Sequence, residues 1–311
     1  MTSLTRRTAR GVSSPYWCSG PGDGVDVCGM RNRETLDAWT PALPLGCSVP
    51  ATGLPLKLCI LEICSGCHSV STAAAAEGRA MFGEATEVEI FSIDGKPGSG
   101  ASRTVDVLSY DWAADEELKK FREETQGRMT IFYAHASPPC GPYSSMGAKC
   151  RPLCERDLRW GDSVVQRCLE LMAFFRPHFW TLESRGPPGL DSRVFMQSLE
   201  PTRSTVNYCR YGWQRWKRTS IWTNIGAWRP RPQCSPSNCC EHFREHGRHA
   251  EQVRTIRRDA RHAALPEQLV REWTNAALQG CLCTECGETT GGRCSCPYSR
   301  AYGHQCQGSR A

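Results

Sequence analysis

The stretch that decides the fold spans residues 56–81 and reads LKLCILEICSGCHSVSTAAAAEGRAM. Its first eight residues are mostly apolar, which predicts a short buried strand. The small residues around Gly66 predict a turn, and the segment from residue 69 to residue 81 predicts a helix. A strand followed by a tight turn and a helix is the repeating unit of α/β proteins. This stretch therefore predicts an α/β fold.

The same alternation continues along the chain. Further strands are predicted at residues 87–93, 104–108, 129–136, 179–182, 205–209 and 219–223. Further helices are predicted at residues 115–125, 158–175, 193–199 and 265–278. The pattern predicts a doubly wound, mostly parallel sheet with helices on both faces. In such sheets, ligands bind beyond the carboxyl ends of the strands.

Length and composition limit the class of protein. The chain has 311 residues, of which 40% are hydrophobic and 23% are charged, as expected for a globular protein with one main domain. We expect a disordered tail at residues 1–55, a catalytic domain at residues 56–228 and a small, basic, Cys/His-rich appendage at residues 229–311. No stretch approaches the roughly 18 apolar residues of a membrane span, so no membrane partner is predicted.

The first residues bear on localisation. Residues 1–14 lack the apolar centre of a signal peptide, which predicts an intracellular protein of the nucleus or cytoplasm. The run of residues 1–22 is rich in Arg, Ser and Thr and has no acidic residue, which is also typical of an organelle transit peptide. An organelle is therefore the alternative location.

A single cysteine follows the predicted strand at residues 129–136, within Ser137-Pro138-Pro139-Cys140. Two consecutive prolines fix φ and remove two amide donors, so the thiol of Cys140 is presented from a rigid turn. Thiolates are strong nucleophiles, which makes Cys140 a candidate for covalent catalysis. The alternative is a buried structural thiol, since the chain has 20 cysteines.

Three acidic residues stand at or near predicted strand ends. Asp94 ends the second strand, where an acid can bind ribose hydroxyls, or can instead cap a helix. Asp106, in the next strand, could accept from an adenine amino group. Glu183 follows an apolar strand, where burial would let it hold a proton; the alternative is a salt bridge with Arg185.

Positive charge is concentrated between residues 203 and 261. Thirteen Arg and Lys residues there oppose four acids, giving 13 − 4 = +9, against a net charge of +6 for the whole chain. Within this window, Arg215, Lys217 and Arg218 alternate with aromatic residues just before a strand. Cations can bind phosphates while indoles stack on bases, so this segment predicts a nucleic-acid contact. The alternative is a solvated surface.

Taken in order, these segments resemble the DNA (cytosine-5) methyltransferase family, particularly its short forms in phages and large viruses. The resemblance covers residues 56–224. Residues 61–69 are similar to the family's first motif. Pro139-Cys140 is similar to its nucleophile motif, and residues 180–190 are similar to its Glu-containing segment. Residues 211–224 resemble the basic segment. The chain departs from the family at His68, where glycine is usual, at Gly141, and at Ser184-Arg185.

The resemblance implies the methyltransferase fold and S-adenosylmethionine as cofactor, with double-stranded DNA as partner. Cys140, Glu183 and Arg218 would act on a flipped cytosine, and Arg215, Lys217 and Arg218 would contact DNA. The residues implied for the cofactor are Ile63, Cys64, Ser65, Gly66, Ser69, Asp94, Asp106 and Pro138. Two alternatives stay open. The chain could be a tRNA cytosine-5 methyltransferase, or it could be a catalytically inert DNA-binding relative.

The cysteine-rich tail suggests structural zinc. Paired short spacings make Cys283, Cys286, Cys294 and Cys296 the first candidate site, with a disordered thiol-rich end as the alternative. A second, looser candidate set comprises Cys234, Cys239, Cys240, His242, His246 and His249.

Overall fold

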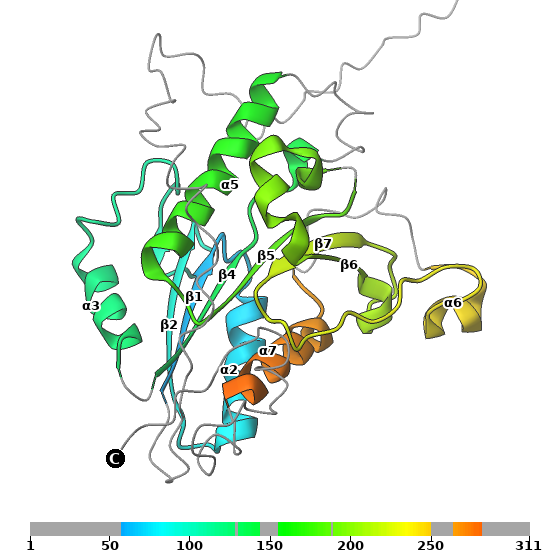
Figure 1. The fold of residues 1–311 in the computed structure, drawn as a ribbon, viewed down its shortest axis with the longest axis horizontal. Helices are drawn as coiled ribbons and strands as arrows, with labels where there is room; N and C mark the ends of the chain where they lie inside the picture. Colours follow the sequence, from blue (N-terminus) through cyan, green and yellow to red (C-terminus); the bar gives the residue numbers. More distant parts are fainter. Residues whose placement is uncertain (1–56, 128–129, 144–154, 188, 250–263, 282–311) are drawn as a thin grey trace, which may run out of the picture. The chain divides into compact units, whose positions relative to one another are not determined.

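A seven-stranded sheet forms the centre of the part of the chain that the computed structural model describes, residues 57–127, 130–143, 155–187, 189–249 and 264–281 (Figure 1). The strands lie in the order β3-β2-β1-β4-β5-β7-β6. Their bounds are β1 Lys57–Ile63, β2 Glu87–Asp94, β3 Arg103–Thr104, β4 Thr130–Ala136, β5 Phe179–Arg185, β6 Arg203–Asn207 and β7 Arg218–Thr223. β1 to β5 are parallel, and β7 is antiparallel to both of its neighbours. The predicted mostly parallel α/β fold is confirmed.

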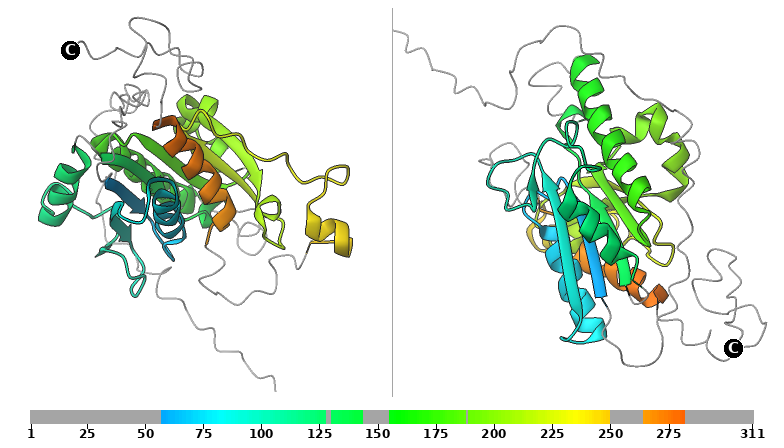
Figure 2. Two further views of the ribbon diagram at one scale, coloured as in Figure 1. Left: turned by 90° about the horizontal axis from the view of Figure 1, so that it is seen from below. Right: turned by 90° about the vertical axis from the view of Figure 1, so that its left-hand side faces the viewer.

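Helices cover both faces of this sheet. The α-helices are α2 Ser69–Phe82, α3 Glu116–Thr125, α5 Glu155–Phe175, α6 Glu241–His246 and α7 Glu267–Cys281. Short 3₁₀ turns are η1 Gly141–Tyr143, η2 Leu190–Ser192, η3 Val194–Thr202 and η4 Tyr208–Tyr211. Helices α2 and α7 lie on one face, and α3 and α5 lie on the other (Figure 2). Among the described helices, none has the length and apolarity that a membrane crossing requires.

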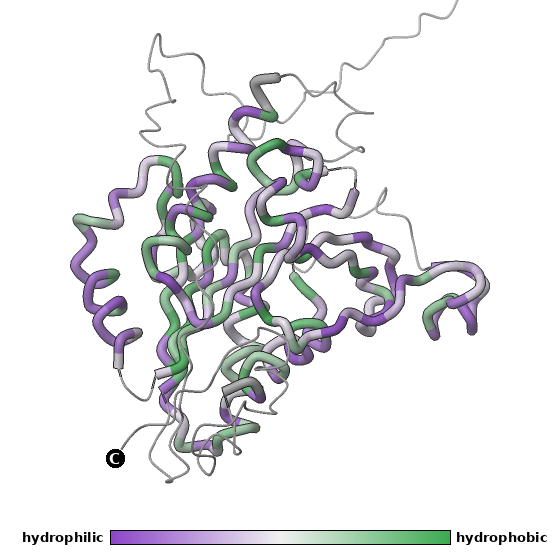
Figure 3. Tube along the Cα trace, viewed as in Figure 1, coloured by the Kyte–Doolittle hydropathy of each residue, from purple (hydrophilic) through white to green (hydrophobic). Residues whose placement is uncertain are grey.

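The central strand β4 shows how each face is buried. Successive side chains of a strand point to opposite faces, so Ile131 and Tyr133 join the core cluster that includes α2 and α7. Phe132 points the other way, with its ring 5.9 Å from Phe121 of α3 and 6.0 Å from Phe175 of α5. Buried on both sides, the central strands are apolar along most of their length (Figure 3).

Helix α7 is part of the sheet's own core. Trp273 is fully buried in the cluster shared with α2. Two hydrogen bonds fasten the same contact, from Leu265 N to Ser69 Oγ at 3.1 Å and from Asn275 Nδ2 to Glu77 Oε1 at 2.7 Å. The core of the fold therefore extends past residue 228, where we placed the end of the catalytic domain.

Three elements of the structure differ from the elements predicted from the sequence. β3 has only two residues, because Asp106 begins a turn in which its carboxylate accepts from Leu108 N at 3.0 Å. The strand predicted at residues 104–108 is therefore wrong beyond its first residue. The helix predicted at residues 193–199 is the 3₁₀ segment η3, which contains Pro201. β6 begins earlier than predicted and ends at Asn207, after which the chain enters η4.

Candidate active site

Four strand ends meet at one edge of the sheet. In the pairing register, Ile63 at the end of β1 lies opposite both Ile93 of β2 and Ala136 of β4. Ala136 in turn lies opposite Leu182 of β5. The segments that follow these strands therefore open at the same edge, at the point where the strand order reverses between β1 and β4. Ligand sites of doubly wound sheets lie at such points.

The turn after β1 is built on left-handed backbone. Cys64, Gly66 and His68 have φ values of 57°, 56° and 57°. Gly66 N donates to Asp94 Oδ2 at 2.7 Å, and Lys96 N donates to Asp94 Oδ1, also at 2.7 Å. The two predicted cofactor residues Gly66 and Asp94 are thus in direct contact, and the carboxylate of Asp94 orders both of the turns it joins.

The start of α2 is closed by a residue that we did not single out from the sequence. Glu62 is buried and accepts from Val70 N at 3.4 Å and from Ser71 N at 3.1 Å. Burial raises the pKa of Glu62, and the helix amides act against that rise. Glu62 therefore occupies two of the amides at this helix start. The hydroxyl of Ser69, also predicted as a cofactor contact, accepts a hydrogen bond from Leu265 N.

The turn nevertheless has features that fit a bound ligand. Ser65 Oγ is buried and has no hydrogen-bond partner among the described residues. A Cβ built at Gly66 meets no atom within 4 Å, so the backbone there borders open space. The ring of His68 bonds Ser99 O through Nε2 at 3.0 Å, which directs it to the loop after β2. Asp106 is exposed and lies beside that loop, with its Cα 3.9 Å from a Cβ built at Gly95.

Cys140 lies at the same edge, immediately after β4. Ser137 N donates to Ile63 O at 3.1 Å, which ties the start of its turn to the end of β1. Pro138 is buried, and Tyr143 N donates to Cys140 O at 3.2 Å. The turn that carries the thiol is therefore fixed at both ends.

Charged groups act on the Cys140 thiol. Its pKa is raised, chiefly by burial and further by the negative charge of Glu183. The positive charges of Lys217 and Arg185 act in the opposite direction and lower the pKa. Cys140 and Glu183, which are 43 positions apart in the sequence, thus share one electrostatic environment.

Glu183 is buried in β5 and is held by two donors. Tyr208 Oη donates to Glu183 Oε1 at 2.9 Å, and Lys217 Nζ donates to the same oxygen at 3.2 Å. The Lys217 ammonium also lies 4.5 Å from the centre of the Tyr208 ring. Burial of the ammonium would lower the pKa of Lys217, but its acidic neighbours, led by Glu183, raise it, so the residue is a cation.

Sequence reasoning missed Tyr208 and gave Lys217 a different role. Tyr208 stands inside a run that we predicted as a strand, so its hydroxyl carried no visible signal. We predicted Lys217 as a DNA contact, but in the fold it pairs with Glu183. Lys217 stands between Arg215 and Arg218 in the sequence, so nothing local distinguished it as the partner of Glu183.

Arg218 lies on the other side of β7. Glu183 is paired with Ile221, and side chains alternate along a strand, which places Lys217 on the Glu183 face and Arg218 on the opposite face. Gly186 N donates to Arg218 O at 2.9 Å, and a Cβ at Gly186 would lie 2.7 Å from the Arg218 side chain. Arg218 Nε is buried and has no hydrogen-bond partner in the described part of the chain. Arg215 lies in the preceding loop and is half-buried.

The two zinc predictions fare differently. The first candidate set, Cys283, Cys286, Cys294 and Cys296, lies outside the described residues. From the second set, Cys234, Cys240 and His249 come together with Cys209, a residue that we did not include. Cys239, His242 and His246 are not in this group.

Comparison with known proteins adds an independent observation. No protein-family model matches the chain. Over 190 residues the chain is 26% identical to a protein of Frog virus 3 (isolate Goorha) named "Probable DNA (cytosine-5)-methyltransferase", and the match covers 58% of this chain and 77% of the viral protein. The chain resembles the DNA (cytosine-5) methyltransferases. The resemblance drawn from the motifs is confirmed, and it supports a methyltransferase at the level of enzyme class.

A solved structure was also found. The Entamoeba histolytica methyltransferase EhMeth aligns with a TM-score of 0.38 and 10% identity, over 57% of this chain. The alignment covers 56% of the EhMeth chain, so the shared part is just over half of each protein.

Proposed function

We propose that the chain transfers a methyl group from S-adenosylmethionine to carbon 5 of cytosine in DNA. The observation that carries the proposal is the convergence of a thiol and a carboxylate at one sheet edge: Cys140 after β4 and Glu183 in β5, with Lys217 and Tyr208 holding the carboxylate. A nucleophile beside a buried acid is the arrangement that addition to an electron-poor ring requires.

The turn after β1 is the proposed cofactor site. The buried hydroxyl of Ser65, the open space beside Gly66 and the ordered Asp94 supply a polar donor or acceptor, room for close approach and a carboxylate. S-adenosylmethionine held there would supply the electrophilic methyl group that carbon 5 accepts. The ring of His68 does not fill the space beside Gly66, where a built Cβ meets no atom within 4 Å. It bonds Ser99 O in the loop after β2 instead.

The chain's own residues would act on a cytosine extruded from the helix, since a stacked base hides its ring. The sulfur of Cys140 would form a bond to carbon 6, and the electron pair of the 5,6 double bond would become available at carbon 5. Glu183 would accept from the exocyclic amine and, when protonated on Oε2, would donate that proton to the ring nitrogen, because both observed bonds are to Oε1. After carbon 5 has accepted the methyl group, which would leave S-adenosylhomocysteine behind, a base would take the carbon-5 proton, the bond between the Cys140 sulfur and carbon 6 would break, and the thiolate would return.

Protonation of Cys140 is the control point in this scheme. Burial favours the neutral thiol, whereas Lys217 and Arg185 favour the thiolate that adds to the base. We propose that Lys217 therefore has two functions: it positions Glu183 and it assists ionisation of Cys140.

The direct experiment supplies tritiated S-adenosylmethionine with cytosine-containing duplex DNA or with tRNA. Label in DNA supports the proposal. Label in tRNA alone would assign the chain to the tRNA cytosine-5 methyltransferases, and binding of DNA without label would indicate an inert relative. Bisulfite mapping of DNA co-expressed with the chain would then give the methylated sites.

The covalent step has its own test. Cys140→Ser should abolish turnover and leave duplex binding intact, while Cys239→Ser, at a half-buried position after β7, should keep activity. DNA that contains 5-fluorocytosine should trap an adduct on Cys140, because the carbon-5 fluorine cannot leave as a proton does. Full activity of Cys140→Ser would exclude this mechanism.

A further inference from the structure

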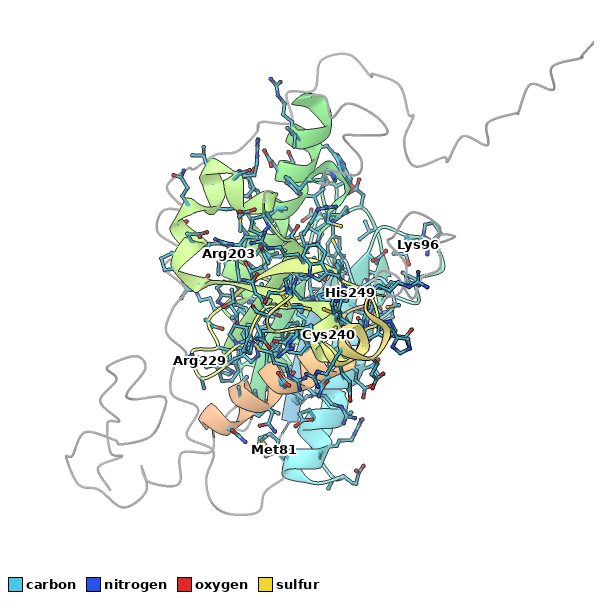
Figure 4. The ribbon with its side chains drawn as sticks, turned by 90° about the vertical axis from the view of Figure 1, so that its right-hand side faces the viewer. Met81, Lys96, Arg203, Arg229, Cys240 and His249 are labelled. Carbon is cyan, nitrogen blue, oxygen red and sulfur yellow. The ribbon has the colours of Figure 1, made fainter. Side chains whose placement is uncertain are left out.

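Four metal-ligating side chains form a second cluster. They are Cys209 of η4, Cys234 and Cys240 after β7, and His249 after α6. Their ligand atoms all lie within 4.8 Å of one another. Cys234 Sγ is 3.4 Å and Cys240 Sγ is 3.3 Å from His249 Nε2. Figure 4 shows Cys240 and His249 close together beside α6.

These separations fit one tetrahedral ion. Zinc–sulfur bonds of about 2.3 Å and zinc–nitrogen bonds of about 2.0–2.1 Å place two sulfurs about 3.8 Å apart, and a sulfur and a nitrogen about 3.6 Å apart. The observed contacts are close to these distances. Three sulfurs and one imidazole nitrogen also form one of the usual ligand sets of structural zinc.

The backbone around the ligands is fixed by hydrogen bonds that do not involve a metal. Cys240 N donates to Cys234 Sγ at 3.3 Å, across a turn closed by the bridge between Ser235 and Asn238. Cys234 N donates to Asn207 Oδ1 at 2.9 Å, at the end of β6. Such outer contacts orient the ligands of metal sites and are part of their design.

Apolar packing does not explain why the segment from Cys234 to His249 stays in place. Helix α6 has six residues, and none of them is buried. Cys240, which precedes the helix, is buried beside the other ligands. Arg210 Nη1 donates to Cys239 O at 2.9 Å, which is a single, partly buried hydrogen bond. A bound ion would supply the missing attachment.

We infer that Cys209, Cys234, Cys240 and His249 bind one structural Zn²⁺ ion. All four positions are protein ligands, so the site is closed to substrate. The ion joins α6, which carries Arg244, to η4, whose Tyr208 holds Glu183. The inference stands on the ligand geometry and does not depend on methyl transfer.

Zinc content of the full chain, measured by elemental analysis, tests the inference. Because cysteines at residues 283–296 could bind a second ion, the readout is the difference between variants. Cys240→Ser and His249→Ala should each contain about one zinc fewer per chain than the unmodified protein. Cys239→Ser and His242→Ala, which change neighbouring residues outside the cluster, should contain as much as the unmodified protein. Equal zinc in all five proteins, or an equal loss in the Cys239→Ser control, would overturn the site.

A second measurement covers the case in which a ligand variant does not fold. His249→Cys keeps four ligands and should keep the ion. With Co²⁺ in place of zinc, this variant should show a stronger sulfur-to-cobalt charge-transfer band than the unmodified protein, because a fourth thiolate replaces the imidazole. Identical cobalt spectra for the two proteins would show that residue 249 is not a ligand and would refute the inference.

Discussion

The hydroxyl of Tyr208 offers the sharpest test of how Glu183 is held. Tyr208→Phe removes one oxygen and preserves the ring, which is fully buried. The lost hydrogen bond, 2.9 Å long, ends on a carboxylate, and such bonds contribute about 1.5–3 kcal/mol. Lys217 still donates to Glu183 at 3.2 Å, so the loss should stay below the about 3–5 kcal/mol that follows when a buried charge loses its partner.

The assay is chemical or thermal unfolding of the full chain, followed by circular dichroism. A loss of about 1.5–3 kcal/mol corresponds to a decrease in Tm of about 3–12 °C for a domain of this size. Tyr133→Phe is the matched control, because its hydroxyl lies 2.6 Å from Thr181 Oγ1, a neutral partner, in an equally buried place. That variant should lose only about 0.5–1.5 kcal/mol.

A double-mutant cycle isolates the pair. If Tyr208 acts through Glu183, the combination of Tyr208→Phe with Glu183→Gln should show a coupling free energy of about 1 kcal/mol or more. A coupling below about 0.5 kcal/mol, or a Tyr208→Phe loss no larger than the Tyr133→Phe loss, would refute the idea that this hydroxyl fixes the carboxylate.

Three further outcomes are expected. Trp273→Ala should lower the free energy of unfolding by about 3–5 kcal/mol because it empties the contact between α7 and α2, whereas Arg271→Ala on the exposed side should cost little; equal effects in denaturant titrations would contradict the packing. His135 has its pKa lowered to about 3 by burial. Its unfolded pKa is about 6.5, so the unfolded state binds the proton more readily between these values, and stability should fall as pH falls through this window. His135→Gln should flatten that slope, and an unchanged slope would assign it to other groups. Alkylation of Cys140 by iodoacetamide, followed by mass spectrometry, should still accelerate above the ordinary thiol pKa of about 8.5, and Lys217→Met should move the profile to higher pH; a plateau below pH 8.5 would contradict the raised pKa.

The fold was largely predictable because its signals are local. Short apolar runs alternate with amphipathic stretches, and one parallel sheet accommodates them in a doubly wound order. The errors fall where side chains compete with regular structure. At Asp106 a carboxylate bonds the backbone two residues ahead and turns the chain, which shortens β3.

The candidate site was predictable only for residues at strand ends. Cys140, Glu183, Gly66 and Asp94 were singled out because parallel strands bring their carboxyl ends to one edge. Tyr208 and Cys209 were not singled out, because their partners lie 25 or more positions away in the sequence. Glu62 was not singled out either, because nothing in the strand it belongs to marks it as the acceptor for the amides of the following helix. Pairings between remote segments leave no periodic trace in a single sequence.

The docking of α7 on α2 also has a consequence for biosynthesis. Ser69 and Leu265, which bond each other, are separated by 196 positions. At translation rates of about 5–20 residues per second, α2 would wait about 10–40 s on the ribosome before its partner helix emerges. During that interval its apolar side is available to chaperones or to other nascent chains, and a fragment that stops before α7 should accumulate as aggregate.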